Sequence, residues 1–509
     1  MINPYFDVSV KEFGAVGDGL ADDTAAIQRA LDSGAKSVTI PDGKFVISNI
    51  LEPSENQHLV VNGTIRLSDS PCTPITSDVK IGDTQVTVKD ASGFEPRQWV
   101  TLHDDRLPIQ GGGRKTRRQS AGSARILSIS GHTLHLDRAS ARSYLCEANA
   151  VVGRQHSAIW IRHAGVRISG SGTIDGNKSQ HINTAPGFLE TEHGEDWRAA
   201  SGILAMGDGV LKNITIEDVT VCDVTLMGIM LVNTEQSVIR NTTCRGAHDK
   251  NIILWCCRDC QIVGNQCTDS EFEDGIMLHQ VHNLADACER ILIQGNICKN
   301  NARFGIHIGA NMQQIHLANN LCVENGLNLS IYGDNCTSTG DIASGTTDRL
   351  FTPDVYRPNV LLAGHFISVV NLTATRTRFV GLEIAGHHIS VTGGIIGEMA
   401  APSPDEGKEG LCVEKGEWGA GSGEFYVQGD CRIAIALIPD FCGGRAQIFP
   451  KNVRVSSMTI HGCRVGIKAC NESKNISMDG MISIDNQIPT QVEDLASQEV
   501  RLTNWISQI

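Results

Sequence analysis

A repeat of a little more than twenty residues organises the chain between residues 210 and 332. Each unit contains a short alternating apolar run, a polar turn and a second apolar run. One aspartate and four asparagines fall at the same point of successive units, at intervals of 23, 24, 31 and 24 residues: Asp218, Asn241, Asn265, Asn296 and Asn320. The longest interval holds an insertion between His279 and Glu289. A period in the low twenties, built of runs too short for helices, predicts a solenoid of stacked β-coils.

The residue types at these positions suit a parallel coil. Each strand of such a coil pairs with its equivalent one turn away, at about 4.8 Å, so that like residues stack. Stacked asparagine amides can hydrogen-bond along the column, and small apolar thiols can fill the interior. A leucine-rich repeat has a similar period, but its LxxLxL frame is absent and β-branched residues dominate the runs. A cysteine follows each of the five positions: Cys222, Cys244, Cys267, Cys298 and Cys322.

Composition limits the classes of function. The chain has 509 residues, of which 41% are hydrophobic and 20% charged, and a net charge of −14. This charge argues against a nucleic acid or an anionic membrane as the main partner. No run reaches the length of a membrane span, and the N-terminus lacks the basic and then apolar pattern of a signal peptide. A secreted or virion-associated location is expected, through another route or after removal of a signal, and a cytoplasmic location stays open.

The 17 cysteines do not predict a metal site. Their spacing is periodic rather than paired, as stacked interior thiols require. Cys256, Cys257 and Cys260 resemble half of a zinc site, but a second pair with a histidine at ligand spacing is missing. We therefore expect reduced, buried thiols and no cofactor.

The strongest local motif lies at the N-terminus. FDVSVKEFGAVGDGLADDTAAIQRALDSGAKSVTIPDGKFVIS predicts a strand, a loop, a helix and a strand, and the apolar face of the helix would cover the open end of a solenoid. FGAVGDGxxDDTxAIQxAL with the VxIPxGxF strand resembles the opening of the pectate-lyase-like right-handed parallel β-helix superfamily. That superfamily includes phage tailspike depolymerases, mannuronan C5-epimerases, polysaccharide lyases and glycoside hydrolases. The resemblance covers residues 6–75 closely and residues 155–335 by repeat pattern.

The resemblance implies an all-β chain, a right-handed single-stranded parallel β-helix with an N-terminal capping helix. Residues 1–75 are then the cap and first coils. Residues 76–150 alternate with period two around turns and predict a small inserted antiparallel β subdomain. Residues 151–340 are the central coils, which carry the groove, and residues 341–509 are further decorated coils and a C-terminal cap.

Three features beside the coils are candidates for substrate binding. Residues 181–202 form a long excursion with Glu192 and Trp197, and the tryptophan could stack on a sugar ring or anchor its own loop. Asp175 precedes this excursion. Arg117 belongs to a glycine-flanked basic loop, which is either a solvated loop or an arm that reaches an acidic polysaccharide.

Acidic and basic residues cluster just before the bends of adjacent coils. In the repeat frame one coil offers His248, Asp249 and Lys250, and the next offers Glu273 and Asp274. Asp249 over Glu273 would place two carboxylates about 5 Å apart, near the separation in retaining glycosidases. Like charges so close would raise one pKa and supply an acid and a base. The competing interpretation is a surface salt bridge between Lys250 and Asp274.

The same bends offer groups that could bind substrate. Arg303, His279 and His307 lie at or just past them, although each histidine could also be a satisfied, half-buried imidazole. Together the cluster predicts a glycosidase that cleaves an extracellular acidic polysaccharide, and a homotrimer is possible because tailspikes of this scaffold are trimers.

Two alternatives stay open. A polysaccharide lyase or C5-epimerase acting on uronates needs a Lys, Arg, His or Tyr near the sugar C5, and Ca²⁺ is then a possible cofactor. Lys250, Arg303, His248 and His279 could serve, although the epimerase-type DPH triplet is absent. A non-catalytic adhesin or tail spike needs none of these groups.

Overall fold

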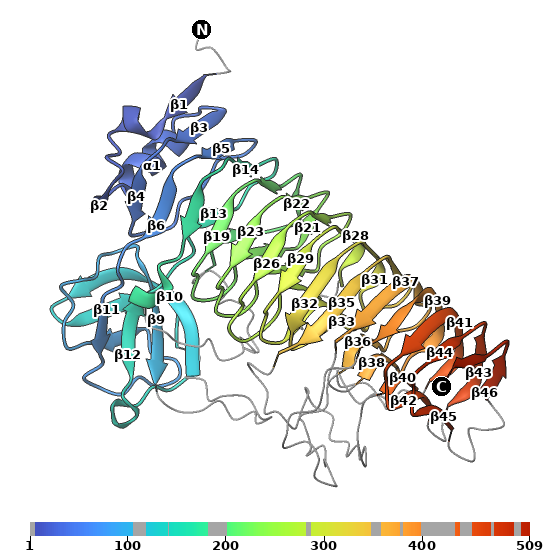
Figure 1. The fold of residues 1–509 in the computed structure, drawn as a ribbon. Helices are drawn as coiled ribbons and strands as arrows, with labels where there is room; N and C mark the ends of the chain where they lie inside the picture. Colours follow the sequence, from blue (N-terminus) through green and yellow to red (C-terminus); the bar gives the residue numbers. More distant parts are fainter. Residues whose placement is uncertain are drawn as a thin grey trace. The chain divides into compact units, whose positions relative to one another are not determined.

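The computed structural model consists almost entirely of β-strands joined by turns (Figure 1). Its described residues form two compact units, unit 1 up to Cys260 and unit 2 from Gln261, and each is described by itself. The parallel all-β architecture predicted from the repeat is confirmed in both units. None of the helices in the described segments is long and apolar enough to cross a bilayer. The described residues are 6–104, 119–140, 142–181, 201–280, 287–347, 358–376, 380–398, 433–437, 450–469, 473–492 and 500–508.

Unit 1 begins with a cap formed by the short helix η1 (Val10–Phe13) and by α1 (Thr24–Leu31). Amphipathic spacing gives α1 one apolar face, and that face is buried as predicted. Its buried residues are Ala26, Ile27, Ala30 and Leu31.

Parallel coils follow the cap in unit 1, and each full coil contributes one strand to each of three columns. The first column holds β1 (Asp7–Ser9), β3 (Ser37–Ile40), β5 (His58–Val61), β14 (Arg167–Ser169), β18 (Thr215–Glu217) and β22 (Val238–Arg240). The second holds β2 (Asp18–Asp22), β4 (Lys44–Ile47), β6 (Thr64–Leu67), β15 (Thr173–Asp175), β19 (Thr220–Cys222) and β23 (Thr243–Arg245). The third holds β13 (Ile159–Ile161), β16 (Ile203–Ala205), β20 (Ile229–Val232) and β24 (Ile252–Trp255). A short pair joins β17 (Leu211–Lys212) to β21 (Thr234–Glu235).

The predicted antiparallel insertion interrupts these coils between β6 and β13. It has its own apolar core around Tyr144, Ile126 and Leu134, which are fully buried. Its strands are β7 (Cys72–Pro74), β12 (Val151–Arg154), β9 (Trp99–Asp104), β10 (Gln119–Ser130), β11 (Thr133–Leu136) and β8 (Gln85–Thr87), in that order across the sheet. Two single-turn helices accompany unit 1, η2 (Cys146–Ala148) and η3 (Lys178–Gln180).

Unit 2 repeats the three-column arrangement with parallel strands in register (Figure 1). The first column holds β25 (Gln261–Val263), β28 (Glu289–Gln294), β31 (Gln313–Ala318), β34 (Thr337–Thr339), β37 (Ser368–Thr375), β39 (His387–Gly397), β41 (Lys451–His461), β43 (Lys474–Asp479) and β46 (Val500–Thr503). The second holds β26 (Gln266–Thr268), β29 (Ile297–Lys299), β32 (Leu321–Asn325) and β35 (Ile342–Thr346), continues through the long strands β37, β39 and β41, and ends with β44 (Ile482–Ile484) and β47 (Ile506–Gln508). The third holds β27 (Ile276–His279), β30 (Phe304–Ile308), β33 (Leu327–Ile331), β36 (Pro358–Leu362), β38 (Val380–Ile384), β40 (Ile433–Leu437), β42 (Val465–Ala469) and β45 (Ile488–Val492).

The predicted asparagine ladder is present in unit 2. Asn265, Asn296 and Asn320 are buried, and each amide donates to the side-chain oxygen of the next rung, which is Asp341 at the end of the ladder. In the same unit Cys267, Cys298 and Cys322 are buried and in register, as predicted.

The ladder assignment is wrong by one residue in unit 1. Asp218 and Asn241 are exposed and left-handed, with φ of 61° and 52°, so they form the bend and not the interior. The interior rung is the next residue, Val219 or Thr242, each 1% exposed. In unit 2 the corresponding bend residue precedes the asparagine, as Gly264 does before Asn265.

Acid is expected to destabilise unit 1 through two histidines. Burial lowers the pKa of His156 to about 3 and that of His181 to about 4, from 6.5. Between its folded-state pKa and 6.5, each histidine is protonated in the unfolded chain but not in the folded chain. The free energy of unfolding therefore falls as the pH falls from 6.5 towards 4. We expect urea unfolding at pH 7.5 and pH 5 to show this loss. The double variant His156→Gln/His181→Gln should lose less between the two pH values, and an equal loss would contradict the assignment.

Candidate functional site

The third column of unit 1 carries the first predicted cluster at the turn before β24. Backbone pairing with the preceding coil fixes this turn, because the amide of Asp249 donates to the carbonyl of Leu226 at 3.0 Å and the carbonyl of Lys250 accepts from the amide of Gly228 at 2.8 Å. His248, Asp249 and Lys250 are all at least nine-tenths buried. The turn therefore presents a preformed charged group and not a flexible surface loop.

Asp249 and Lys250 pair with each other. Lys250 Nζ donates to Asp249 Oδ2 at 3.0 Å, and the two side chains are 11% and 6% exposed. The other oxygen, Asp249 Oδ1, is buried and accepts no hydrogen bond from the residues that the structure describes. Asp249 therefore has one carboxylate oxygen that no described residue uses in a hydrogen bond.

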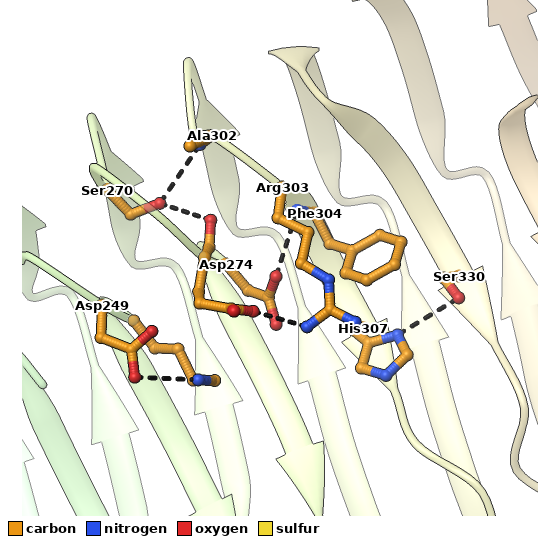
Figure 2. Close-up of polar contacts among 10 residues, drawn as sticks. Asp249, Ser270, Asp274, Ala302, Arg303, Phe304, His307 and Ser330 are labelled. Atoms are coloured by element: carbon orange, nitrogen blue, oxygen red, sulfur yellow. Dashed lines mark hydrogen bonds and ion pairs between the residues drawn. The ribbon is translucent and has the colours of Figure 1, made fainter. Parts of the chain in front are cut away.

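The third column of unit 2 carries the second cluster, centred on an ion pair (Figure 2). Arg303 Nη1 lies 2.5 Å from Glu273 Oε2, and the side chains are 14% and 0% exposed. The amide of Arg303 also donates to the carbonyl of Glu273 at 3.0 Å, so the two turns are joined through backbone and side chain. A guanidinium fixed in this way cannot change its orientation freely.

Asp274 and Ser270 complete the two turns. Asp274 Oδ1 accepts from the amide of Phe304 at 3.1 Å, and the carboxylate is fully buried. Ser270 Oγ donates to the carbonyl of Glu273 at 2.6 Å, and the amide of Ala302 donates to the same hydroxyl at 3.4 Å. These contacts satisfy turn backbone groups that would otherwise be buried without partners.

An aromatic chain extends from Arg303 along β30 and β33 (Figure 2). The guanidinium lies over the ring of Phe304 at 4.6 Å, and that ring stacks on His307 at 4.5 Å with an interplanar angle of 11°. His307 Nδ1 contacts Ser330 Oγ at 3.2 Å, and the imidazole meets Tyr332 edge-on at 5.7 Å. Unit 2 thus assembles a guanidinium, an imidazole and a phenol from two consecutive coils.

This geometry corrects the roles predicted for Glu273 and Asp274. A carboxylate that attacks or protonates a sugar must reach it, whereas Glu273 and Asp274 expose nothing and are already bonded to Arg303 and Phe304. Glu273 orients Arg303, and Asp274 holds a turn. The separation of Asp249 and Glu273 stays a prediction, because the two residues belong to different units.

Two family models match parts of the chain. Residues 7–94 match the family described as rhamnogalacturonase A/epimerase, pectate lyase-like. Residues 122–347 match the family described as periplasmic copper-binding protein NosD. The described coils have the three parallel columns of a β-helix. The chain is a parallel β-helix protein, and its residues 7–94 match a pectate-lyase-like family.

Curated relatives match its N-terminal part. A mannuronan C5-epimerase of Azotobacter vinelandii is 44% identical over 68 residues, which cover 11% of this chain and 7% of the epimerase. The pre-neck appendage protein of Bacillus phage B103 is 37% identical over 86 residues, which cover 16% of this chain and 10% of that protein. The match thus spans about a tenth or less of either relative.

Solved structures resemble the β-helix over almost its whole length. An N-terminal fragment of bacteriophage Phi29 gene product 12 aligns with a TM-score of 0.58 and 15% identity, covering 98% of this chain and 70% of the fragment. The A-module of an Azotobacter vinelandii mannuronan C5-epimerase aligns with a TM-score of 0.52 and 14% identity, covering 97% of this chain and 100% of the module. At such identities the likeness shows the fold alone.

The remaining predicted site residues of the β-helix fall into two groups. Asp175 is paired with Arg66 at 3.0 Å, and His279 Nδ1 lies 2.5 Å from the carbonyl oxygen of Gln280. Each of these two side chains thus has a polar partner, and their roles in substrate binding stay predictions. Three others lie outside the described residues: Glu192, Trp197 and Arg117.

One group of side chains in unit 1 has the composition of a metal site. The ligand atoms of Asp175, Cys222 and Asp223 lie within 4.8 Å of one another. Burial, followed by the two nearby carboxylates, raises the pKa of the Cys222 thiol to about 12, so this thiol stays protonated. Ca²⁺ takes six to eight oxygen ligands. Two carboxylates, one of them already bonded to Arg66, do not fit that requirement.

Sequence reasoning missed Tyr332 and Ser330. Both follow from the strand register, in which His307 pairs with Ser330 and Ile308 pairs with Ile331. Tyr332 then lies one residue beyond the paired end of β33, against the same imidazole. His307 is stacked on Ser330 of the next coil, and alternate residues of a strand share one face, so Tyr332 lies on the same face as Ser330. This reasoning would have identified both residues.

Proposed function

We propose that this β-helix protein acts on a polysaccharide that contains uronic acids by removing the proton from sugar C5. The observation that carries the proposal is the guanidinium of Arg303, fixed by the buried Glu273 beside the His307 imidazole and the Tyr332 phenol. The N-terminal similarity to mannuronan C5-epimerases supports the same class of substrate.

The chemistry follows from what a uronate needs. Its carboxylate repels the charge that develops when the C5 proton leaves, and a fixed cation removes that obstacle. Arg303 would bind the carboxylate. His307 would accept the C5 proton at Nε2, because Nδ1 contacts Ser330.

Two outcomes are then open to the electron pair from the C5–H bond. In elimination it forms a C4=C5 double bond, the C4–O bond breaks, and the leaving oxygen takes a proton from the Tyr332 hydroxyl. In epimerisation a proton returns to the opposite face of C5. Both outcomes use the same groups and need no free carboxylate pair.

A glycoside hydrolase is the second candidate function. Asp249 supports a hydrolase, because one oxygen of its carboxylate accepts no hydrogen bond within the described part of the chain. A hydrolase needs a second carboxylate as acid or nucleophile. Glu273 and Asp274 are already bonded to Arg303 and Phe304, so a hydrolase is less well supported than removal of the C5 proton.

The test is incubation with alginate, polygalacturonate and a neutral glucan, followed by three measurements. Elimination is expected to give ultraviolet absorbance from an unsaturated product. Epimerisation in D₂O is expected to give deuterium at C5 without cleavage. New reducing ends alone would establish the hydrolase and overturn the proposal. Binding without any product would indicate an adhesin or a tail spike.

We also propose an extracellular or virion-associated location, supported by the similarity to a phage appendage protein. We also propose that the chain assembles as a homotrimer. Sedimentation equilibrium of the purified chain tests it directly, and a monomer at micromolar concentration would contradict it.

A further inference from the structure

A column of left-handed residues runs along unit 2 at the bend near the start of the first-column strands. Strand register places one of them on each coil, directly in line with the next. Their φ angles lie between 51° and 58°. The column consists of Arg290, Gln314, Asn335, Phe366, His388, Asn452 and Asn475.

Phe366 is the exception in this column. Asparagine adopts the left-handed conformation readily, whereas a bulky side chain at φ of 57° is an outlier. The interior of the coils does not hold this ring, because Phe366 is 58% exposed. The chain therefore keeps a large apolar ring on its surface at a position that is polar in the other residues of the column, and function is the usual reason for such a conflict.

The ring is held in a defined orientation. Phe366 stacks on His388 of the next coil at 4.6 Å, with an interplanar angle of 14°. His388 is fixed in turn, because the amide of Asn452 donates to its Nε2 at 2.9 Å, and the amide of Asn475 donates to Asn452 Oδ1 at 2.8 Å. One face of the Phe366 ring is thus covered by His388, while 58% of the residue stays exposed.

A ligand would meet the part of Phe366 that stays exposed. The amide of Asn335 turns away from Phe366 and donates to Gln313 Oε1 at 3.0 Å. A flat ring of pyranose size on Phe366 would occupy the next place in the stack, at the spacing that the coils set. Its apolar C–H face would meet the aromatic ring, and its hydroxyls would lie near the asparagine amides.

We propose that Phe366, oriented by His388, is a saccharide-binding platform distinct from the Arg303 cluster. This proposal rests on the proposed function in one respect, since a polysaccharide is the ligand both of the platform and of the Arg303 cluster. The platform holds a distant part of the same chain, so it contributes to affinity for long polymers and not to the reaction on short ones.

The test compares Phe366→Asn with the wild type by affinity electrophoresis in gels that contain alginate, polygalacturonate or dextran. Removing a stacked ring is expected to raise the dissociation constant for the retarding polymer about tenfold. Ile395→Ser is the matched control, because Ile395 is 44% exposed on β39 outside the column. It should change the dissociation constant by less than about twofold. Thermal unfolding should show that Phe366→Asn is as stable as the wild type or more stable, because asparagine suits the backbone.

Three results would overturn the platform. These are retardation of Phe366→Asn equal to that of the wild type, no retardation of the wild type by any of the polymers, and a change of oligomeric state in Phe366→Asn, which would mark a contact between copies of the chain. Failure of the proposed function is distinct. In that case the polymers yield no product with the wild type, while Phe366→Asn still binds them more weakly.

Discussion

Glu273→Ala is expected to lower the free energy of unfolding by about 3–5 kcal/mol, because it leaves the guanidinium of Arg303 largely buried without its carboxylate. Glu273 exposes none of its side chain and Arg303 exposes 14%, so water cannot replace the lost partner fully. Chemical denaturation followed by circular dichroism would measure the change. Replacing both partners, as Glu273→Leu/Arg303→Met, should recover most of the loss because no charge is then buried alone.

Glu324→Ala is the matched control for this prediction. Glu324 pairs with Lys299 at 3.6 Å, and the two side chains are 44% and 55% exposed. Removing an exposed pair should cost less than about 1 kcal/mol. Equal losses in Glu273→Ala and Glu324→Ala would mean that the buried pair does not hold the two turns together.

Asn296→Ala is expected to cost about 3–9 kcal/mol, because three buried groups lose a partner at about 1–3 kcal/mol each. Asn296 Oδ1 accepts from both the amide and the side chain of Asn265, at 2.9 Å each. Its side-chain amide also donates to the carbonyl of Ile262 at 2.9 Å. The same denaturation experiment measures the loss.

Asn319→Gly separates the interior ladder from the exposed bend. Asn319 is exposed and left-handed, with φ of 55°, and it directly precedes the buried Asn320. Glycine adopts this conformation without strain, so the change should be within about 0.5 kcal/mol. A loss in Asn319→Gly as large as that in Asn296→Ala would show that the column of buried amides is not what stabilises the coils.

The period of the repeat predicted the architecture because stacked coils require like residues at like positions. Cys267, Cys298 and Cys322 show this directly, since spacing in the sequence became register in the structure. Asp218 and Asn241 were misplaced for a physical reason. Asparagine and aspartate suit an exposed left-handed bend as well as a buried rung, and the sequence alone does not distinguish the two.

The candidate site was only partly predictable. The repeat frame placed Glu273 and Arg303 at neighbouring bends, and they do lie there in unit 2. It could not give the direction of their side chains, because turn residues do not follow the alternation that orients a strand. The carboxylate predicted to face a sugar is paired with Arg303, and the proposed reaction therefore relies on His307 and Tyr332 instead.

The most direct test of the proposed reaction is whether its rate depends on the carboxylate groups of the substrate. The initial rate of product formation should be measured on alginate and polygalacturonate, each as the free acid and as the methyl ester. The wild type and the charge-free pair Arg303→Gln/Glu273→Gln should be compared. If Arg303 binds the uronate carboxylate, the wild type converts the free acid at least about tenfold faster than the ester, and the double variant converts neither form appreciably. Equal wild-type rates on acid and ester, or a wild-type rate in the double variant, would contradict the account.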